Sequence, residues 1–130
     1  MVIQEIEEHL LASLARINRQ AENLHRTFCL KGQDGQLLGG LTCSTAYGWL
    51  HIETLWVSHA YRIQGFGRQL MDAAETFGRN HGCHSAWLDT SNDGAQVFYK
   101  RLGYEVFGEL GNGEDRPPAE HHRWFLQRRL

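Results

Sequence analysis

The sequence predicts a single α/β domain, in which a central mixed β-sheet is flanked by helices. A strand over 49–57, a helix over about 64–80 and a strand over 85–89 follow one another with short connections. Such a right-handed crossover makes the two strands parallel members of one sheet, while hairpin signals elsewhere add antiparallel strands. A length of 130 residues is usual for one domain, so we assign residues 1–130 to one unit.

An amphipathic helix is predicted at the start of the chain. Its apolar residues recur at steps of three and four: Ile3, Ile6, Leu10, Leu14 and Ile17. Because charged residues stand between them, we expect this helix to pack its apolar face on something larger. The helix is expected to end between residues 18 and 23.

Hairpin signals define the strands that come before the crossover. A weakly alternating strand over 27–30 meets Asp34-Gly35, a strong turn signal, and the chain returns over 37–45. Gly39-Gly40 within the returning strand suggests a bulge. Tyr47-Gly48 then turns the chain into the first strand of the crossover, which is rich in β-branched and aromatic residues.

The C-terminal half continues the same alternation of helix and strand. The crossover helix closes at His81-Gly82, where glycine suits the C-cap. A second helix over about 94–102 is terminated by Gly103. The last two strands are expected over 104–110 and 123–127, which makes the sheet mixed.

Composition excludes several classes of protein. The chain carries 13 basic and 15 acidic residues, so no overall positive field attracts nucleic acid or an anionic membrane. No apolar run approaches the roughly 18 residues of a membrane helix, and the acidic start is unlike a signal peptide, so we expect a cytoplasmic protein. Cys29, Cys43 and Cys83 show no paired spacing, which favours small apolar fillers over disulfides or a zinc site.

A glycine-containing turn, Arg62-Ile63-Gln64-Gly65-Phe66-Gly67-Arg68, lies between a predicted strand end and a helix start. Free N–H groups at a helix start can bind an anion such as phosphate, and Arg62 and Arg68 add positive charge. The alternative is that the glycines only permit a tight connection. Arg68-Gln69 after Gly67 excludes a Walker A loop, and Leu70 replaces the third glycine of a dinucleotide fingerprint, which weakens that interpretation.

This turn, after a strand that ends Leu55-Trp56-Val57, resembles the acetyl-CoA signature of the GCN5-related N-acetyltransferases (GNAT family). The resemblance continues in Asn92-x-x-Ala95-x-x-Phe98-Tyr99, followed by Gly103-Tyr104, in the same order and spacing. It covers about 37–110 well and is strongest to short bacterial members with Leu88-Asp89-Thr90 at a strand end. It implies a GNAT-like acyl-CoA N-acyltransferase fold.

The resemblance also implies acetyl-CoA as co-substrate, held where the strands 49–57 and 84–90 splay apart. The pantetheine arm would pair with the main chain of Leu55 and Val57, and an N–H group there would stabilise negative charge on the acyl oxygen. Asn92 would bond the arm, cap the helix that follows, or do both. Lys100 and Arg101 are expected to be solvated helix charges, with reach to the 3′-phosphate as the alternative for either. The implied cofactor-binding residues are Leu55, Trp56, Val57, Arg62, Ile63, Gln64, Gly65, Phe66, Gly67, Arg68, Asn92, Ala95 and Phe98.

Two residues are assigned to catalysis. Tyr99 matches the general acid of the family, because a phenol stays protonated at neutral pH; the alternative is a core aromatic beside Phe98. Glu53 is the expected base. On a regular strand residues 51, 53, 55 and 57 share one face, so Glu53 and His51 point with Leu55 toward the acyl site or directly away from it. The alternative for both is an ordinary polar side chain on a solvated face.

The acceptor is less well defined. Glu114, Asp115 and Glu120 in the loop at 111–120, together with Glu53, favour a cationic amine, and a solvated hairpin is the alternative. No strand is predicted before the first helix, which departs from the family and leaves part of the acceptor wall missing. A homodimer is one way of completing that wall.

The function predicted from the sequence is acetyl-CoA-dependent N-acetylation, by direct transfer to a primary amine of a small molecule or protein. A non-catalytic acyl-CoA-binding sensor is the alternative. A toxin that acetylates aminoacyl-tRNA is disfavoured by the net charge of −2. His121-His122 lacks a third ligand at a suitable spacing, so no metal site is predicted.

Overall fold

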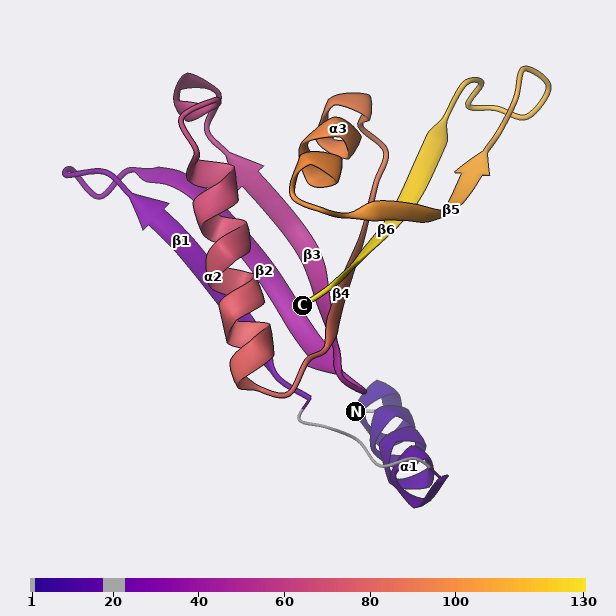
Figure 1. Cartoon of the computed structure of the whole chain (residues 1–130). Helices are drawn as coiled ribbons and strands as arrows, with labels where there is room; N and C mark the ends of the chain where they lie inside the picture. Colours follow the sequence, from indigo (N-terminus) through magenta and orange to yellow (C-terminus); the bar gives the residue numbers. More distant parts are fainter. Residues whose placement is uncertain (1, 18–22) are drawn as a thin grey trace.

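The computed structural model describes residues 2–17 and 23–130. It contains a six-stranded sheet of order β1-β2-β3-β4-β6-β5, in which β3 and β4 are parallel and the other neighbours antiparallel (Figure 1). This confirms the predicted mixed sheet. The elements are α1 Val2–Ile17, β1 His25–Lys31, β2 Leu37–Ala46, β3 Trp49–Val57, the 3-10 helix η1 His59–Tyr61, α2 Phe66–Asn80, β4 Ser85–Thr90, α3 Asp93–Arg101, β5 Glu105–Gly111 and β6 His122–Arg129.

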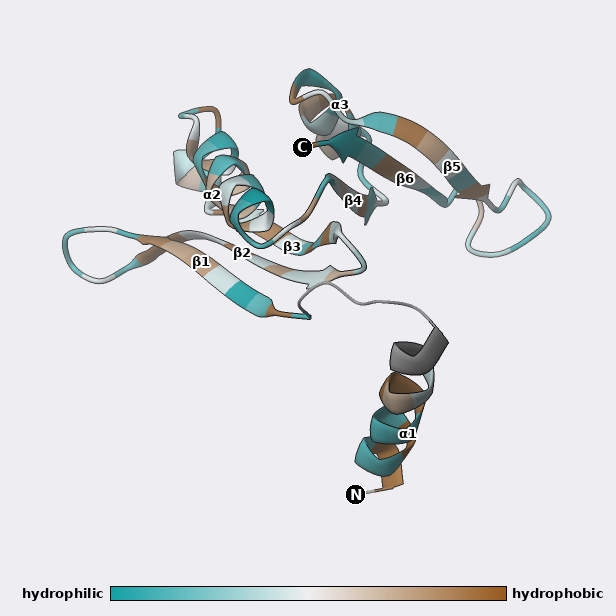
Figure 2. Cartoon of the chain, turned by 60° about the horizontal axis from the view of Figure 1, so that its bottom comes forward, coloured by the Kyte–Doolittle hydropathy of each residue, from teal (hydrophilic) through white to brown (hydrophobic). Residues whose placement is uncertain are grey.

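Helices α2 and α3 lie on the same side of the sheet, which we call the helix face; the opposite side is the open face (Figure 2). The core forms under α2, where apolar residues of the helix meet those of β2, β3, β4 and β6. Met71, Leu50 and Leu126 are completely buried, and each such side chain contributes about 1.5–3 kcal/mol of hydrophobic stabilisation. The predicted spacing of apolar residues therefore defines how α2 sits on the sheet.

The predicted bulge in β2 is displaced by one residue. Leu30 pairs with Gly39 and Lys31 with Leu37, so the extra residue is Leu38, while Gly39 and Gly40 pair regularly. Gly39 has a different role from the one predicted. A Cβ atom there would lie 3.1 Å from the carbonyl oxygen of Trp56 and 3.3 Å from Leu70, so glycine allows close packing between β2, β3 and α2.

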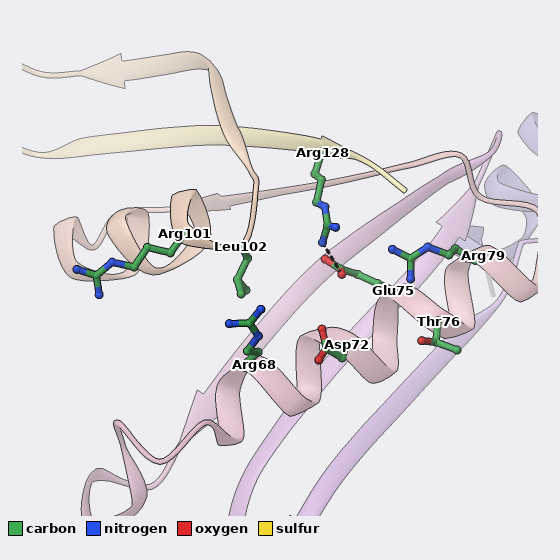
Figure 3. A pocket seen from close by; sticks show the side chains of 8 residues that line it. All are labelled: Arg68, Asp72, Glu75, Thr76, Arg79, Arg101, Leu102 and Arg128. Atoms are coloured by element: carbon green, nitrogen blue, oxygen red, sulfur yellow. Dashed lines mark hydrogen bonds and ion pairs between the residues drawn. The ribbon is translucent and has the colours of Figure 1, made fainter.

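A buried carboxylate links α2 to the far half of the sheet. Glu75 is 2% exposed, and each of its two oxygens accepts one bond: from Nη1 of Arg128 on β6 at 2.7 Å, and from the hydroxyl of Tyr104 at 2.7 Å. Figure 3 shows Arg128 reaching down from β6 to this carboxylate. The charge is therefore both paired and hydrogen-bonded, as burial requires.

Two expectations about apolar residues are wrong. Helix α1 projects from the end of the sheet (Figures 1 and 2), and its residues Ile3, Ile6 and Leu10 are 72%, 61% and 55% exposed, so its apolar face does not pack on the described chain. The predicted end of this helix, at residues 18–23, falls largely outside the described residues. Cys43 and Cys83 fill the core as predicted, but Cys29 is exposed.

Membrane insertion finds no support among the helices described in this structure. None of them combines the length and the apolar character that crossing a bilayer requires.

Arg128→Met should lower the free energy of unfolding by about 3–5 kcal/mol, because it leaves the Glu75 carboxylate buried without its positive partner. Arg129→Met is the matched control: Arg129 is the adjacent residue, is exposed, and should change stability by less than about 0.5 kcal/mol. Urea unfolding followed by circular dichroism measures both. Equal stabilities for the two variants would contradict the assigned role of the pair.

Candidate functional site

Strands β3 and β4 separate soon after they meet. They pair at Trp49–Ser85, Leu50–Ala86 and His51–Trp87. Beyond this point β3 remains paired with β2 as far as Val57, and β4 remains paired with β6 as far as Thr90. Figure 1 shows the two halves of the sheet diverging from this place. The facing edges of the two strands therefore offer main-chain donors and acceptors to a ligand.

The glycine turn lies beside the diverging end of β3. Gly65 is the N-cap of α2 with a φ of +83°, and among the described side chains none caps this helix. The first N–H groups of a helix have no acceptor within it, so this helix start presents free donors. Arg62 fixes the turn to the strand, because its Nε donates to the carbonyl of Val57 at 3.1 Å.

A cleft of about 580 Å³ joins the end of β3, the glycine turn and α3. Tyr99 lines it, as does every predicted cofactor-binding residue except Gln64 and Phe66. Gln64 instead lies 3.5 Å from the carbonyl of Ala60 through its Nε2 atom, and Phe66 stacks on Tyr61 with ring centroids 6.0 Å apart. Two sequence segments that are far apart along the chain thus form one continuous site.

Tyr61 and Gly94 also line the cleft and were not predicted, and Arg101 lines it, for which reach to the cofactor was one of two expectations. Gly94 and Arg101 lie on the same side of α3 as Phe98, at helical steps of four and three. The helical periodicity of the sequence could therefore have identified both as residues of the cleft. Tyr61 lies in η1, and no comparable pattern in the sequence identifies it.

Helix α3 brings a polar cap and a buried phenol to the cleft. Asn92 is the N-cap, and its Oδ1 accepts from the N–H of Ala95 at 3.0 Å, as one of its predicted roles requires. Tyr99 is 7% exposed and lies edge-on to Phe98. Burial raises the pKa of Tyr99 to about 12, so its hydroxyl keeps its proton at neutral pH.

The expectation that Glu53 and Leu55 share a face is wrong, because β3 contains a bulge. Thr42 pairs with Thr54 and Cys43 with Ile52, which leaves Glu53 as the extra residue. Leu55 therefore returns to the helix face and packs against the core. Glu53 lies on the open face, exposed, with Oε1 3.9 Å from Nδ1 of His25, and does not line the cleft.

Positive charge gathers at the cleft and continues between the two helices. Arg62, Arg68 and Arg101 line the cleft. Arg68 of α2 and Arg101 of α3 also line an adjoining cavity of about 390 Å³, which further contains Arg79, Asp72 and the paired Glu75 and Arg128 (Figure 3). The cleft thus has a cationic outlet that suits an elongated anion.

The loop at 111–120 lies away from this site. It projects from the end of the β5–β6 hairpin (Figure 1), and its residues Glu114, Asp115 and Glu120 are exposed. These residues do not line the cleft. Of the two expectations for this loop, the exposure of its acidic residues agrees with the solvated hairpin.

Comparison with known proteins agrees with the geometry of the site. The model of the acetyltransferase (GNAT) family matches residues 3–104. A protein of Agrobacterium fabrum, acetyltransferase Atu2258, is 36% identical over 107 residues, covering 82% of this chain and 77% of its own. Blasticidin-S acetyltransferase of Streptomyces morookaense is 35% identical over 89 residues, covering 68% of this chain and 63% of its own.

A solved structure extends the similarity to almost the whole chain. The crystal structure of an Agrobacterium tumefaciens protein matches with a TM-score of 0.85 at 31% identity, over 99% of this chain and 91% of the other. The cleft and the sheet around it are thus part of a shared architecture.

Ile63→Asn should raise the free energy of unfolding by about 1 kcal/mol. Ile63 is fully exposed and has a φ of +67°, a conformation that is costly for a β-branched residue and better tolerated by asparagine. Ile63→Val keeps the branched Cβ and should leave stability unchanged. Urea unfolding measures the difference between the two variants, and a loss of stability in Ile63→Asn would contradict this account of the turn.

Proposed function

The chain belongs to the acetyltransferase (GNAT) family, and we propose that it transfers the acetyl group of acetyl-CoA directly to a primary amine of a small molecule. The observation that carries this proposal is the cleft at the divergence of β3 and β4. Its lining combines a helix start with free amides, three arginines and a buried tyrosine. This set of groups suits an anion with a long neutral arm.

Different residues of the cleft suit the different chemical parts of acetyl-CoA. The pyrophosphate carries the negative charge, and the start of α2 with Arg62 and Arg68 would hold it. The pantetheine amides would pair with the free main-chain edge of β3 near Leu55 and Val57. Asn92 has its Oδ1 engaged by Ala95, so its amide N–H groups would donate to the arm. Arg101, beyond the turn, would meet the nucleotide end.

Tyr99 would act as the general acid. When the amine nitrogen bonds to the acyl carbon, the carbon–sulfur bond breaks and the sulfur leaves as a thiolate. The Tyr99 hydroxyl would give that sulfur its proton, which leaves coenzyme A as the thiol. The nitrogen loses one more proton as the amide forms, and that proton would return to the Tyr99 oxygen, which restores the acid. A main-chain N–H group near the end of β3 would stabilise the negative charge on the acyl oxygen during the transfer.

Glu53 would act as the general base from the open face. An amine is protonated at neutral pH, so one proton must leave before the nitrogen can attack. The carboxylate would take it through a water molecule, because Glu53 does not line the cleft itself. Its exposure leaves room for that water.

The similarity to blasticidin-S acetyltransferase, whose name gives a small molecule as its substrate, favours a small-molecule acceptor over a protein. This chain spans 63% of the length of that relative, so the substrate of the relative is not transferred to this chain.

Gly67→Glu should abolish acetyl-CoA binding, because it puts a carboxylate where the pyrophosphate is expected. Gly67→Ala is the control for bulk, since a Cβ there would lie 3.2 Å from Phe98 and need a small shift of that ring. We expect Gly67→Ala to weaken binding by less than about tenfold. Isothermal titration calorimetry measures both, and unchanged affinity in Gly67→Glu would mean that the pyrophosphate lies elsewhere.

Tyr99→Phe and Glu53→Gln should each lower kcat by about 10²–10⁴-fold while acetyl-CoA affinity changes by less than about threefold. Thiol release measures turnover, and calorimetry measures affinity. Tyr47→Phe, in the distant turn between β2 and β3, is the control for loss of a phenol. Full activity in both site variants would refute the assigned acid and base.

The pH dependence of kcat tests Tyr99 further. Since burial raises the pKa of Tyr99 to about 12, the acid form persists as pH rises and is lost only near that value. The rate should therefore show no loss that depends on Tyr99 as the pH rises to about 10. A fall with a midpoint below about pH 9 that disappears in Tyr99→Phe would contradict the assignment.

A further inference from the structure

Helix α3, which carries the proposed acid, has little buried surface of its own. Of its nine residues, all of which the structure describes, Tyr99 alone is buried. Ala95 and Phe98 are only partly buried where they pack against the core. Because most helical stability comes from packing of a buried face, apolar contacts alone do not hold so short a helix in one orientation. The position of α3 therefore depends on the contacts at its ends.

The C-terminal end of α3 joins Tyr99 directly to Tyr104. Gly103 between them and the helix end has a φ of +97°, and its N–H donates to the carbonyl of Lys100 at 3.0 Å. The N–H of Tyr104 donates to the carbonyl of Tyr99 at 3.1 Å. This is a Schellman motif, in which the side chains of the two bonded residues commonly touch. The two tyrosine rings do so edge-on, with centroids 6.0 Å apart and planes 65° apart.

The far end of the Tyr104 side chain is fixed to α2. Its hydroxyl donates to Oε2 of Glu75 at 2.7 Å, and Oε1 of the same carboxylate accepts from Nη1 of Arg128. Tyr104 and Glu75 are 3% and 2% exposed, so water does not readily replace this bond. The direction of the bond fixes the phenol of Tyr104, and through the edge-on contact it also fixes the ring of Tyr99.

These links connect the acid to the helix start where the pyrophosphate is expected. Glu75 lies in the third turn of α2, whose N-cap is Gly65, and about 15 Å from that cap along the helix axis. Helix α3 also touches α2 near its start, since a Cβ at Gly67 would lie 3.2 Å from Cζ of Phe98. Contacts at two places along α2 fix both the position and the tilt of α3. They therefore set the distance from the expected phosphate site to the Tyr99 hydroxyl.

We propose that Tyr104 is the positioning residue of the general acid: its hydrogen bond to Glu75 holds the Tyr99 ring where the Tyr99 hydroxyl meets the thioester sulfur. The inference rests on the proposed function, to which this acid belongs. A proton is transferred only over a hydrogen-bond distance, about 2.6–3.2 Å, and a misplacement of about 1 Å can cost roughly a hundredfold in rate. Tyr104 does not line the cleft, so it acts through Tyr99 and not on the reacting atoms.

Tyr104→Phe removes the hydroxyl and keeps the ring against Tyr99. We expect kcat to fall about tenfold and KM for acetyl-CoA to change by less than about twofold, because the cofactor contacts are elsewhere. Leu41→Val is the control for lost stability, since Leu41 is buried in the core on β2 and does not line the cleft. Thiol release measures both, with the fastest acceptor among butylamine, 1,4-diaminobutane and 4-aminobutyrate. An equal fall in kcat in the two variants would overturn the proposal.

A conservative replacement tests the hydrogen bond itself. Tyr104→4-aminophenylalanine keeps the ring and returns an N–H donor to the carboxylate of Glu75. Its kcat should recover to within about threefold of the unmodified protein. A kcat as low as that of Tyr104→Phe would mean that the bond does not hold the acid.

A double-mutant cycle separates a role through Tyr99 from a general structural role. In Tyr99→Phe no acid is left to position, so the addition of Tyr104→Phe should lower kcat by less than about twofold further. The addition of Leu41→Val should have the same small effect in either background. If Tyr104→Phe lowered kcat as much in the Tyr99→Phe background as in the unmodified protein, Tyr104 would act by another route and the proposal would be overturned.

A spectroscopic measurement keeps the test independent of turnover. The ring signals of Tyr99, in protein labelled with ¹³C in its tyrosine rings, are identified by their absence from the NMR spectrum of Tyr99→Phe. Tyr104→Phe should shift or broaden them, because the Tyr99 ring is no longer held in one position, and Leu41→Val should not. Unchanged signals in Tyr104→Phe would overturn the positioning role and leave the proposed function intact. Displaced signals in a protein that acetylates none of the three amines would contradict the proposed function and retain the link between the two tyrosines.

Discussion

The separation of β3 from β4 is the constraint on which the rest of the structure depends. Beyond the His51–Trp87 pair, β3 and β4 no longer pair with each other. There β3 pairs only with β2, and β4 pairs only with β6. The edges left free would be costly if they were buried without partners. They are tolerable because a cleft lies beside them. The same feature therefore creates the cavity and leaves main-chain groups available to whatever fills it.

The angle between the two diverging halves of the sheet must be held by interactions between them, and a buried network of charged and polar side chains provides these interactions. Helix α2 lies on the β1–β3 half, while Arg128 belongs to β6 in the other half (Figure 3), and Tyr104 directly precedes β5. Glu75 of α2 bonds both of them. An apolar contact would tolerate sliding, but these bonds are directional and cannot be satisfied at other angles. Burial and the neighbouring carboxylate also raise the pKa of Tyr104 strongly, which keeps its hydroxyl a donor over a wide pH range.

The features that were predicted from the sequence are those fixed by local chemistry. Asp34-Gly35 forms its turn, with Oδ1 of Asp34 accepting from the N–H of Gln36, and Asn92 caps α3 through a residue three positions away. The unpredicted features depend on distant partners. Glu75 is buried because of Arg128, 53 residues later. The bulge at Glu53 appears only when β2 and β3 are aligned, because a single strand does not reveal its register.

The bulge at Glu53 also explains how β3 lies beside arginines on one face and carries a carboxylate on the other. Without the extra residue, Leu55 and Val57 would lie on the same face as Glu53, away from the core and from the arginines of the glycine turn. With it, the apolar end of β3 joins the helix face beside Arg62 and Arg68, and the carboxylate stays on the open face near His25. Opposite charges thus lie on the two faces of a single strand, although the chain as a whole is nearly neutral. The arginines of the cleft and the carboxylate of Glu53 are thus kept apart, on opposite faces of the same strand.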